Sequence, residues 1–139
     1  MKKALLILIQ IFVFIFAANG NEEPGEDSAL SFDKPIAQTM EFRFDIEEDL
    51  YPDQSTFKIV DFAFLSNEKG ERAALVNLTN TAVAPRTLAP NQIYGFFADG
   101  TYRRPTNSSD RIDGGKTNSV LLSFGVSKTP LVKLIVRNF

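Results

Sequence analysis

The chain contains no cysteine, no histidine and no tryptophan among its 139 residues. Without cysteine it can form no disulfide and offers no thiolate to a metal or a substrate. Without histidine it lacks the base of the Ser-His-Asp and Cys-His enzymes and a common zinc ligand. These absences exclude the commonest hydrolases and zinc enzymes, and we predict a protein that is not an enzyme and binds no cofactor.

A long apolar run occurs only at the start of the chain. Lys2 and Lys3 precede an apolar stretch over residues 4–18 that a single glutamine interrupts, and small residues follow. This order is typical of a cleavable secretory signal, whereas a membrane anchor needs about 20 apolar residues. We therefore predict a signal-peptide helix over residues 1–20, cleavage after Gly20, and a periplasmic or secreted protein without membrane insertion. An exported chain without cysteine fits a bacterial periplasm better than a eukaryotic extracellular space.

Charge is unevenly divided along the chain, although the formal net charge is only −2. Residues 21–71 hold 14 acids and 4 bases, whereas residues 72–139 hold 3 acids and 9 bases. Acidic and basic strands that interleave in the fold would neutralise each other, and separated halves would instead form a charged docking surface. The export signal and the acidic total disfavour nucleic acid as a partner.

The remaining chain reads as an acidic leader followed by one small domain. Residues 21–34 have too few apolar side chains to bury, so we expect a flexible leader before a single domain over residues 35–139. Met40–Ile46 alternates apolar and charged residues, which predicts a strand with one buried face. Further strands are predicted at 57–65, 71–81, 92–97, 101–102, 117–126 and 131–137.

The strand pattern predicts an all-β fold. About seven short strands in a domain of about 100 residues are typical of an antiparallel immunoglobulin-like two-sheet sandwich, with a small barrel as the alternative. Asp99-Gly100 predicts a tight hairpin turn. The inward-facing residues expected in the last two strands are Val120, Leu122, Phe124, Val126, Val132, Leu134 and Val136.

Three segments carry a resemblance to known domains. They are VNLTNT, APNQIYGFFADGTYRRP and GGKTNSVLLSFGVSKTPLVKLIV, which combine an Asn-rich turn, an Asp-Gly hairpin and a Gly turn before two closing strands. In this order they resemble the immunoglobulin-like domains of unknown function in exported bacterial proteins, over about residues 72–136. The resemblance implies the sandwich fold but no activity, because sites are grafted on folds.

A basic cluster beside an aromatic residue is the candidate binding site. Tyr102, Arg103, Arg104 and Arg111 lie in or near loops. Arginine and an exposed aromatic ring engage carboxylate, phosphate or sugar by bidentate hydrogen bonds and stacking. The alternative is that these arginines are ordinary solvated surface residues.

Two groups of acids are candidates for chemistry. Neighbouring carboxylates could act on a glycoside, and oxygen ligands could hold calcium. Solvated loops and turn chemistry explain both groups better, because a tuned carboxylate needs burial and Asp-Gly sequences form turns. We therefore predict neither a catalytic pair nor a metal site at Glu47, Glu48, Asp49, Asp53, Asp99, Asp110 and Asp113.

Three functional classes follow from these residues. The leading expectation is a non-enzymatic binding or structural module of the bacterial cell envelope that contacts protein partners in a larger assembly. The second is a periplasmic chaperone or inhibitor that uses an exposed edge strand. The third is a glycan-binding or carbohydrate-active protein, with an anionic glycan as the ligand.

Overall fold

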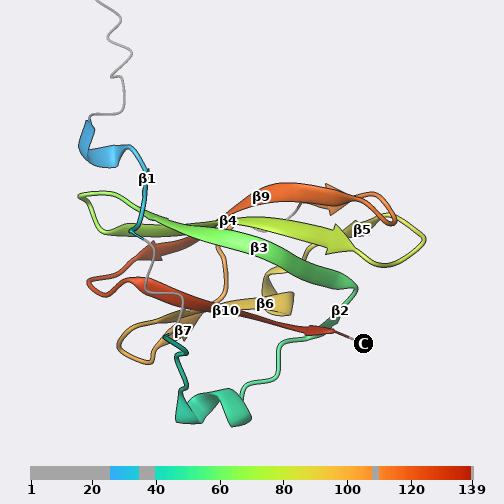
Figure 1. Cartoon of the computed structure of the whole chain (residues 1–139), viewed down its shortest axis with the longest axis horizontal. Helices are drawn as coiled ribbons and strands as arrows, with labels where there is room; N and C mark the ends of the chain where they lie inside the picture. Colours follow the sequence, from blue (N-terminus) through green and yellow to red (C-terminus); the bar gives the residue numbers. More distant parts are fainter. Residues whose placement is uncertain (1–25, 35–39, 108–109, 139) are drawn as a thin grey trace, which may run out of the picture.

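The computed structural model describes residues 26–34, 40–107 and 110–138, and these form an all-β fold of open, mainly antiparallel sheets (Figure 1). Two four-stranded sheets are joined by a small two-stranded ribbon. The first sheet has the order β1-β3-β4-β9, with β1 (Ser31–Phe32), β3 (Phe57–Ser66), β4 (Glu71–Asn80) and β9 (Thr117–Val126).

The second sheet has the order β2-β10-β6-β7. It consists of β2 (Gln54–Ser55), β10 (Leu131–Asn138), β6 (Ile93–Phe97) and β7 (Tyr102–Arg103). The ribbon pairs β5 (Arg86–Thr87) with β8 (Arg111–Ile112), and the 3-10 turns are η1 (Glu26–Ser28), η2 (Asp45–Glu48) and η3 (Pro90–Gln92). In the described part of the chain, the strand pairs are antiparallel except that β2 runs parallel to β10.

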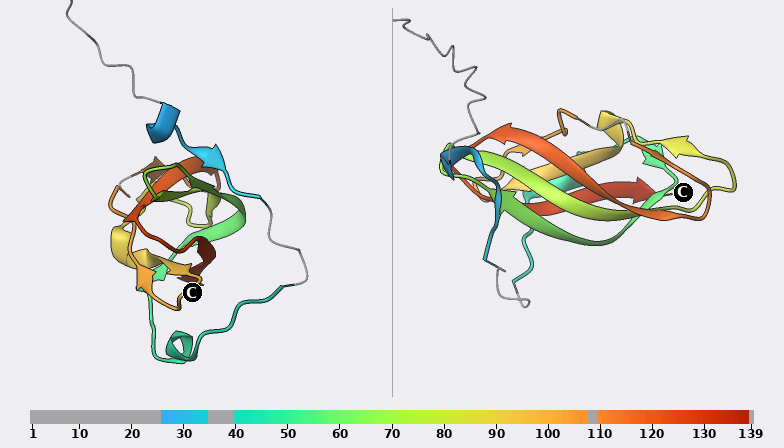
Figure 2. Two further views of the ribbon diagram at one scale, coloured as in Figure 1. Left: turned by 90° about the vertical axis from the view of Figure 1, so that its left-hand side faces the viewer. Right: turned by 90° about the horizontal axis from the view of Figure 1, so that it is seen from above.

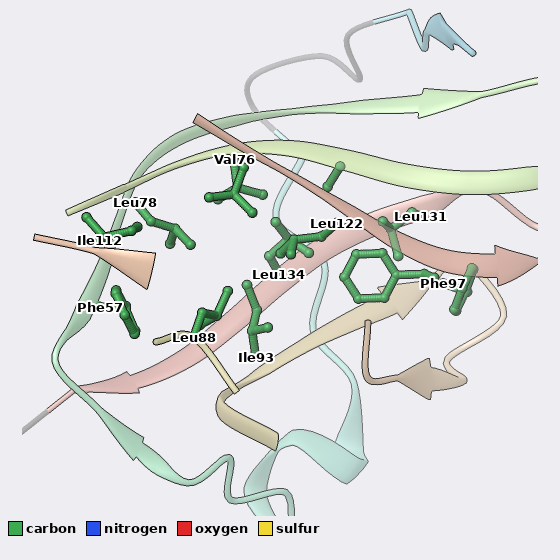
Figure 3. Close-up of a cluster of buried hydrophobic side chains, with 13 residues drawn as sticks. Phe57, Val76, Leu78, Leu88, Ile93, Phe97, Ile112, Leu122, Leu131 and Leu134 are labelled. Carbon is green, nitrogen blue, oxygen red and sulfur yellow. The ribbon is translucent and has the colours of Figure 1, made fainter. Parts of the chain in front are cut away.

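The hydrophobic core lies between the two sheets. Figure 3 shows Val76 and Leu122 from the first sheet among the side chains of Ile93 and Leu134 from the second. Each apolar side chain of this size contributes about 1.5–3 kcal/mol when it is fully buried. Leu88 and Ile112 extend the buried cluster toward the ribbon, so the ribbon is packed onto the same core.

The sequence pattern predicted the long strands correctly. The all-β expectation is confirmed, and β3, β4, β6, β9 and β10 lie where alternating or apolar runs were found. The turn at Asp99-Gly100 is confirmed as well, since Gly100 has a φ of 83° and its N–H donates to the carbonyl of Phe97 at 2.9 Å. Several of the remaining strands are only two residues long, which periodicity cannot detect.

Two bulges change which side chains face the core. In β9 the pairing with β4 shifts after Ser123, and Gly125 has a φ of 77°, so Val126 is exposed rather than inward. In β10 the register shifts between Leu131 and Lys133, and Leu131 rather than Val132 joins the buried cluster between the sheets. A bulge adds one residue to one strand, and strict alternation therefore fails beyond it.

The prediction of a strand over Met40–Ile46 is wrong. Residues 40–44 belong to no strand ladder, and residues 45–48 form η2. The alternation is nevertheless present, because Phe42 and Phe44 are half-buried whereas Glu41, Arg43 and Asp45 are exposed. Residues 40–53, which we call the cover segment, pass along the outer side of the second sheet (Figure 2), and Phe44 contacts its outer face. An extended chain on the face of a sheet has no strand edge to pair with.

Aromatic stacking and one ion pair hold the cover segment in place. Phe44 stacks on Phe96 of β6, with ring centroids 5.3 Å apart. Lys133 of β10 donates to the carbonyl of Phe42 at 3.0 Å and forms a 2.6 Å ion pair with Glu47. The second sheet therefore buries side chains on both faces.

The N-terminal part of the described chain reaches the first sheet. Ser31 lies opposite Ser66 and Phe32 opposite Leu65, and the N–H of Asp33 donates to the carbonyl of Phe64 at 2.9 Å. Strand pairing thus begins before residue 35, within the segment expected to be a flexible leader. The predicted signal helix over residues 1–20 lies outside the described residues. Within the described ranges, no helix has the length and apolar character to span a bilayer.

Candidate functional site

The β6–β7 hairpin carries three of the four predicted binding residues. In its register, Tyr102 lies opposite Phe96 and Arg103 lies opposite Gly95. Successive side chains of a strand point to opposite faces of its sheet. Tyr102 therefore lies on the outer face with Phe96, Arg103 lies on the core side, and Arg104 returns to the outer face.

A well-defined turn fixes this hairpin. The N–H of Phe97 donates to the carbonyl of Thr101 at 2.8 Å. The Asp99 carboxylate accepts from the Thr101 hydroxyl at 2.7 Å and from the Thr101 N–H at 3.0 Å. These hydrogen bonds, with the hydroxyl as the largest cause, lower the pKa of Asp99 below its usual value because they favour the charged form.

Tyr102 belongs to an aromatic cluster on the outer face. Its ring packs edge-on against Tyr94 with centroids 5.6 Å apart, and it packs against Phe96 at 5.7 Å. Tyr94 and Phe96 are buried, whereas Tyr102 keeps 40% of its surface exposed. Tyr102 thus presents a ring to solvent on a rigid aromatic base.

Arg104 is held in place by Tyr94. Its guanidinium carbon lies 5.5 Å from the centre of the Tyr94 ring, and its Nε donates to the Tyr94 hydroxyl at 3.1 Å. The described residues form two ion pairs, Arg43–Glu41 and Lys133–Glu47, so no carboxylate among them neutralises Arg104. The fixed guanidinium can still present its terminal NH₂ groups to a carboxylate or phosphate in a two-point contact.

Arg103 has different surroundings from Arg104. Its Nη1 donates to the carbonyls of Phe124 at 3.2 Å and Val126 at 2.7 Å, and its guanidinium lies over the Phe97 ring at 4.8 Å. These contacts connect β7 of the second sheet with the end of β9 in the first. Arg103 therefore links the two sheets, and its Nη1 is engaged by protein carbonyls.

Arg111 lies away from the other three residues. It belongs to β8 and faces Thr87 of β5, in the ribbon that packs near the end of β4. Figure 1 shows β5 and β7 toward opposite sides of the molecule. The structure thus brings together Tyr102 and Arg104 but not Arg111.

Sequence reasoning missed Tyr94, which orients Arg104. Tyr94 lies in β6, whose five residues are all buried, and the sequence predicts this segment only as a short strand. The available signal was the run Ile-Tyr-Gly-Phe-Phe itself. A strand that is apolar on both faces must be covered on both. We define the Arg104 corner as Tyr94, Tyr102 and Arg104.

The acidic residues lie in several separate environments. Glu47 pairs with Lys133, and a carboxylate oxygen of Asp53 accepts from the side chain of Asn91. Asp99 is engaged by its own turn. In the described part of the chain, no group of three or more His, Cys, Asp or Glu side chains is arranged to hold a metal ion.

Comparison with known proteins adds no relative to this picture. No protein-family model matches the chain, and neither a curated protein nor a solved structure is significantly similar to it. The functional argument therefore rests on the geometry of the Arg104 corner and on the sequence.

Proposed function

We propose that the protein is an exported, non-enzymatic binding module of the bacterial cell envelope that docks a partner protein through the Arg104 corner. The observation that carries this proposal is the state of Arg104. It is oriented by the ring and hydroxyl of Tyr94, yet no acid among the described residues neutralises it. A fixed cation beside an exposed tyrosine suits a carboxylate on a partner, because binding then loses little side-chain entropy.

An immunoglobulin-like sandwich is part of the same proposal. Two open sheets packed around one core support it, as does the resemblance over about residues 72–136. Such sandwiches commonly use the loops at their ends for recognition. The β6–β7 hairpin ends in an exposed turn of this kind, and the Arg104 corner lies on the outer face of its strands.

Export is proposed from the signal-like order of residues 1–20. N-terminal sequencing of the protein recovered from the envelope fraction should begin at Asn21. Recovery of a chain that still begins at Met1 would contradict cleavage.

A pull-down tests the docking role. The full chain, tagged at its carboxyl end and produced in its own host, is compared with Arg104→Glu and with Arg111→Glu as the matched control. Both variants reverse one exposed arginine, but only Arg104 belongs to the corner. We expect a stoichiometric protein partner that the unmodified chain and Arg111→Glu retain and that Arg104→Glu loses.

Two results would count against this function. Equal retention by Arg104→Glu would remove the corner from the interface. Loss of an anionic glycan rather than a protein would move the module to the glycan-binding class, for which the exposed ring of Tyr102 is the supporting feature.

A further inference from the structure

A second exposed surface lies at the end of the molecule opposite the Arg104 corner. Residues 81–85 join β4 to β5, and Figure 1 shows this loop projecting beyond the sheets. Its centre reads Ala-Val-Ala-Pro, and Val83 is 100% exposed. A fully exposed side chain adds nothing to the core. Val83 is therefore free to contact a partner.

The buried Asn80 side chain fixes the shape of this loop. Its Oδ1 accepts from the N–H of Ala82 at 3.0 Å, and its Nδ2 donates to the carbonyl of Ala84 at 3.0 Å. The same amide also bonds the Thr56 hydroxyl and the carbonyl of Ile112, both at 3.0 Å. Asn80 is completely buried, so its hydrogen bonds are protected from water. Two of them hold Ala82 and Ala84, the residues on either side of Val83.

The β8–β9 turn supports the loop from behind. Gly115 donates its N–H to the carbonyls of Asn80 at 2.8 Å and Ala82 at 3.1 Å. At Gly114 an added Cβ would lie 1.9 Å from the carbonyl oxygen of Val83, so only glycine allows this close approach. Val83 is therefore presented by a backbone that is fixed on either side of it.

Net positive charge and a hollow lie beside the tip. A hollow of about 380 Å³ beside it is lined by Ser55, Thr56, Lys58, Thr81, Ala82 and Asn138. Four exposed cations lie at this end, and none of them belongs to an ion pair among the described residues: Lys58, Arg86, Arg111 and Lys116. They outnumber the two exposed acids there, Asp110 and Asp113. A partner with an acidic rim would complement them.

We propose that residues 82–85 form a preformed apolar peg that inserts Val83 into an apolar pocket of a partner protein with an acidic rim. The fixed backbone favours a protein over a lipid surface, because a pocket selects shape and a bilayer does not. The small apolar area of one valine, two alanines and a proline likewise suits a pocket anchor better than membrane insertion. The inference rests on the proposed role as a binding module but not on the Arg104 corner.

Site-specific photo-cross-linking in the native host identifies the occupant. A photoreactive amino acid replaces Val83 in one full-length variant and Val126 in the control. Val126 is also exposed, but it pairs with Glu71 at the far end of β4. We expect a discrete protein adduct from position 83 only, with the cross-link inside an apolar pocket. Absence of an adduct at position 83, or equal adducts at both positions, would overturn the proposal.

Isothermal titration calorimetry with that purified partner then measures how much Val83 contributes to the binding affinity. Val83→Asp should weaken binding by at least about tenfold, since burying a valine side chain is worth about 1.5 kcal/mol or more. Its melting temperature should not change, because Val83 makes no buried contact. Val126→Asp should bind within about twofold of the unmodified chain, and a similar affinity for Val83→Asp would overturn the peg. If Arg104→Glu still binds this partner with unchanged affinity, the peg acts independently of the Arg104 corner.

A fluorescence experiment tests the lipid alternative. The chain has no tryptophan, so Val83→Trp places a single reporter at the tip. We expect its emission to shift to the blue with the partner and to stay unchanged with phosphatidylglycerol vesicles. A shift with vesicles alone would replace the protein pocket by a membrane surface.

Discussion

The outer faces of the two sheets differ in what covers them. On the second sheet, Phe96 is fully buried beneath Phe44 of the cover segment. On the first sheet, Leu121 is 44% exposed and Phe32 is 65% exposed. The outer face of the second sheet is therefore covered at Phe96, whereas that of the first leaves these two apolar side chains partly exposed.

Hydrogen-bonded polar side chains occupy part of the open face. Asn77 donates to Asp61 on one neighbouring strand and accepts from Ser119 on the other at 2.5 Å, and the hydroxyls of Thr79 and Thr117 are 2.6 Å apart. Such cross-strand pairs suit a face that meets water. Because one face of the first sheet meets water, buried and less buried residues alternate along β4 and β9. Because both faces of β6 are covered, its sequence is an apolar run.

The largest effect is expected on the core side of the second sheet, opposite its covered face. In Gly95→Ala the new Cβ would lie 2.7 Å from the Phe124 ring and 2.8 Å from Leu131. Overpacking of this kind costs about 3 kcal/mol. On the open face, Ala63→Val should change the free energy of unfolding by less than about 0.5 kcal/mol. Urea unfolding measures both, and equal stabilities would contradict the difference in packing between the core and the open face.

The next effect tests the cover segment directly. Phe44→Ala removes the ring that stacks on Phe96, and we expect a loss of about 2 kcal/mol, below the range for a fully buried phenylalanine. Phe32→Ala on the open face is the matched control and should cost less than about 0.5 kcal/mol. Thermal unfolding of both variants checks this. A similar loss from the two phenylalanines would show that the cover segment adds no stability.

A smaller effect on stability is expected from the two ion pairs of the cover segment, which differ in burial. Lys133→Met breaks the partly buried pair with Glu47 and should cost about 1 kcal/mol, because it also leaves that carboxylate without its cation. Arg43→Met breaks the exposed pair with Glu41 and should have no measurable effect. Chemical denaturation at low and high salt measures both, and indistinguishable variants would refute the distinction.

The smallest effect concerns the hairpin beside the cover segment. Because hydrogen bonds from Thr101 lower the pKa of Asp99, its stabilising contribution is present above the unfolded pKa of about 3.9 and disappears as pH falls through the lowered folded pKa. An NMR titration of the carboxyl carbon should find this low pKa. Thr101→Val should raise it toward the usual value, and no change in Thr101→Val would exclude the hydroxyl as the cause.

Sequence reasoning succeeded where one residue pattern has one structural meaning. The alternation in β9 and the Asp-Gly turn predicted a strand and a hairpin, and both are present. It failed at Met40–Ile46, because an extended cover and a strand share the same period of two. Only partners distant in the chain, such as Phe96 and Lys133, decide between them.

The candidate site could be predicted only in part. Tyr102, Arg103 and Arg104 are adjacent in sequence, but strand alternation sends Arg103 to the core side, where it bonds β9. Adjacent residues of a strand do not share a face. Asn80 was also missed as the residue that shapes the 81–85 loop, because a buried amide and an exposed amide are identical in sequence.

The pairing of β2 with β10 has a consequence for folding kinetics. It places Gln54 beside Arg137, and β10 is central to its sheet, between β2 and β6. Domains with such high contact order fold in about milliseconds to seconds, since large loops must close before the contacts form. Under the export proposed above, slow closure of this sheet would leave the chain extended long enough to be threaded through a membrane pore before it folds.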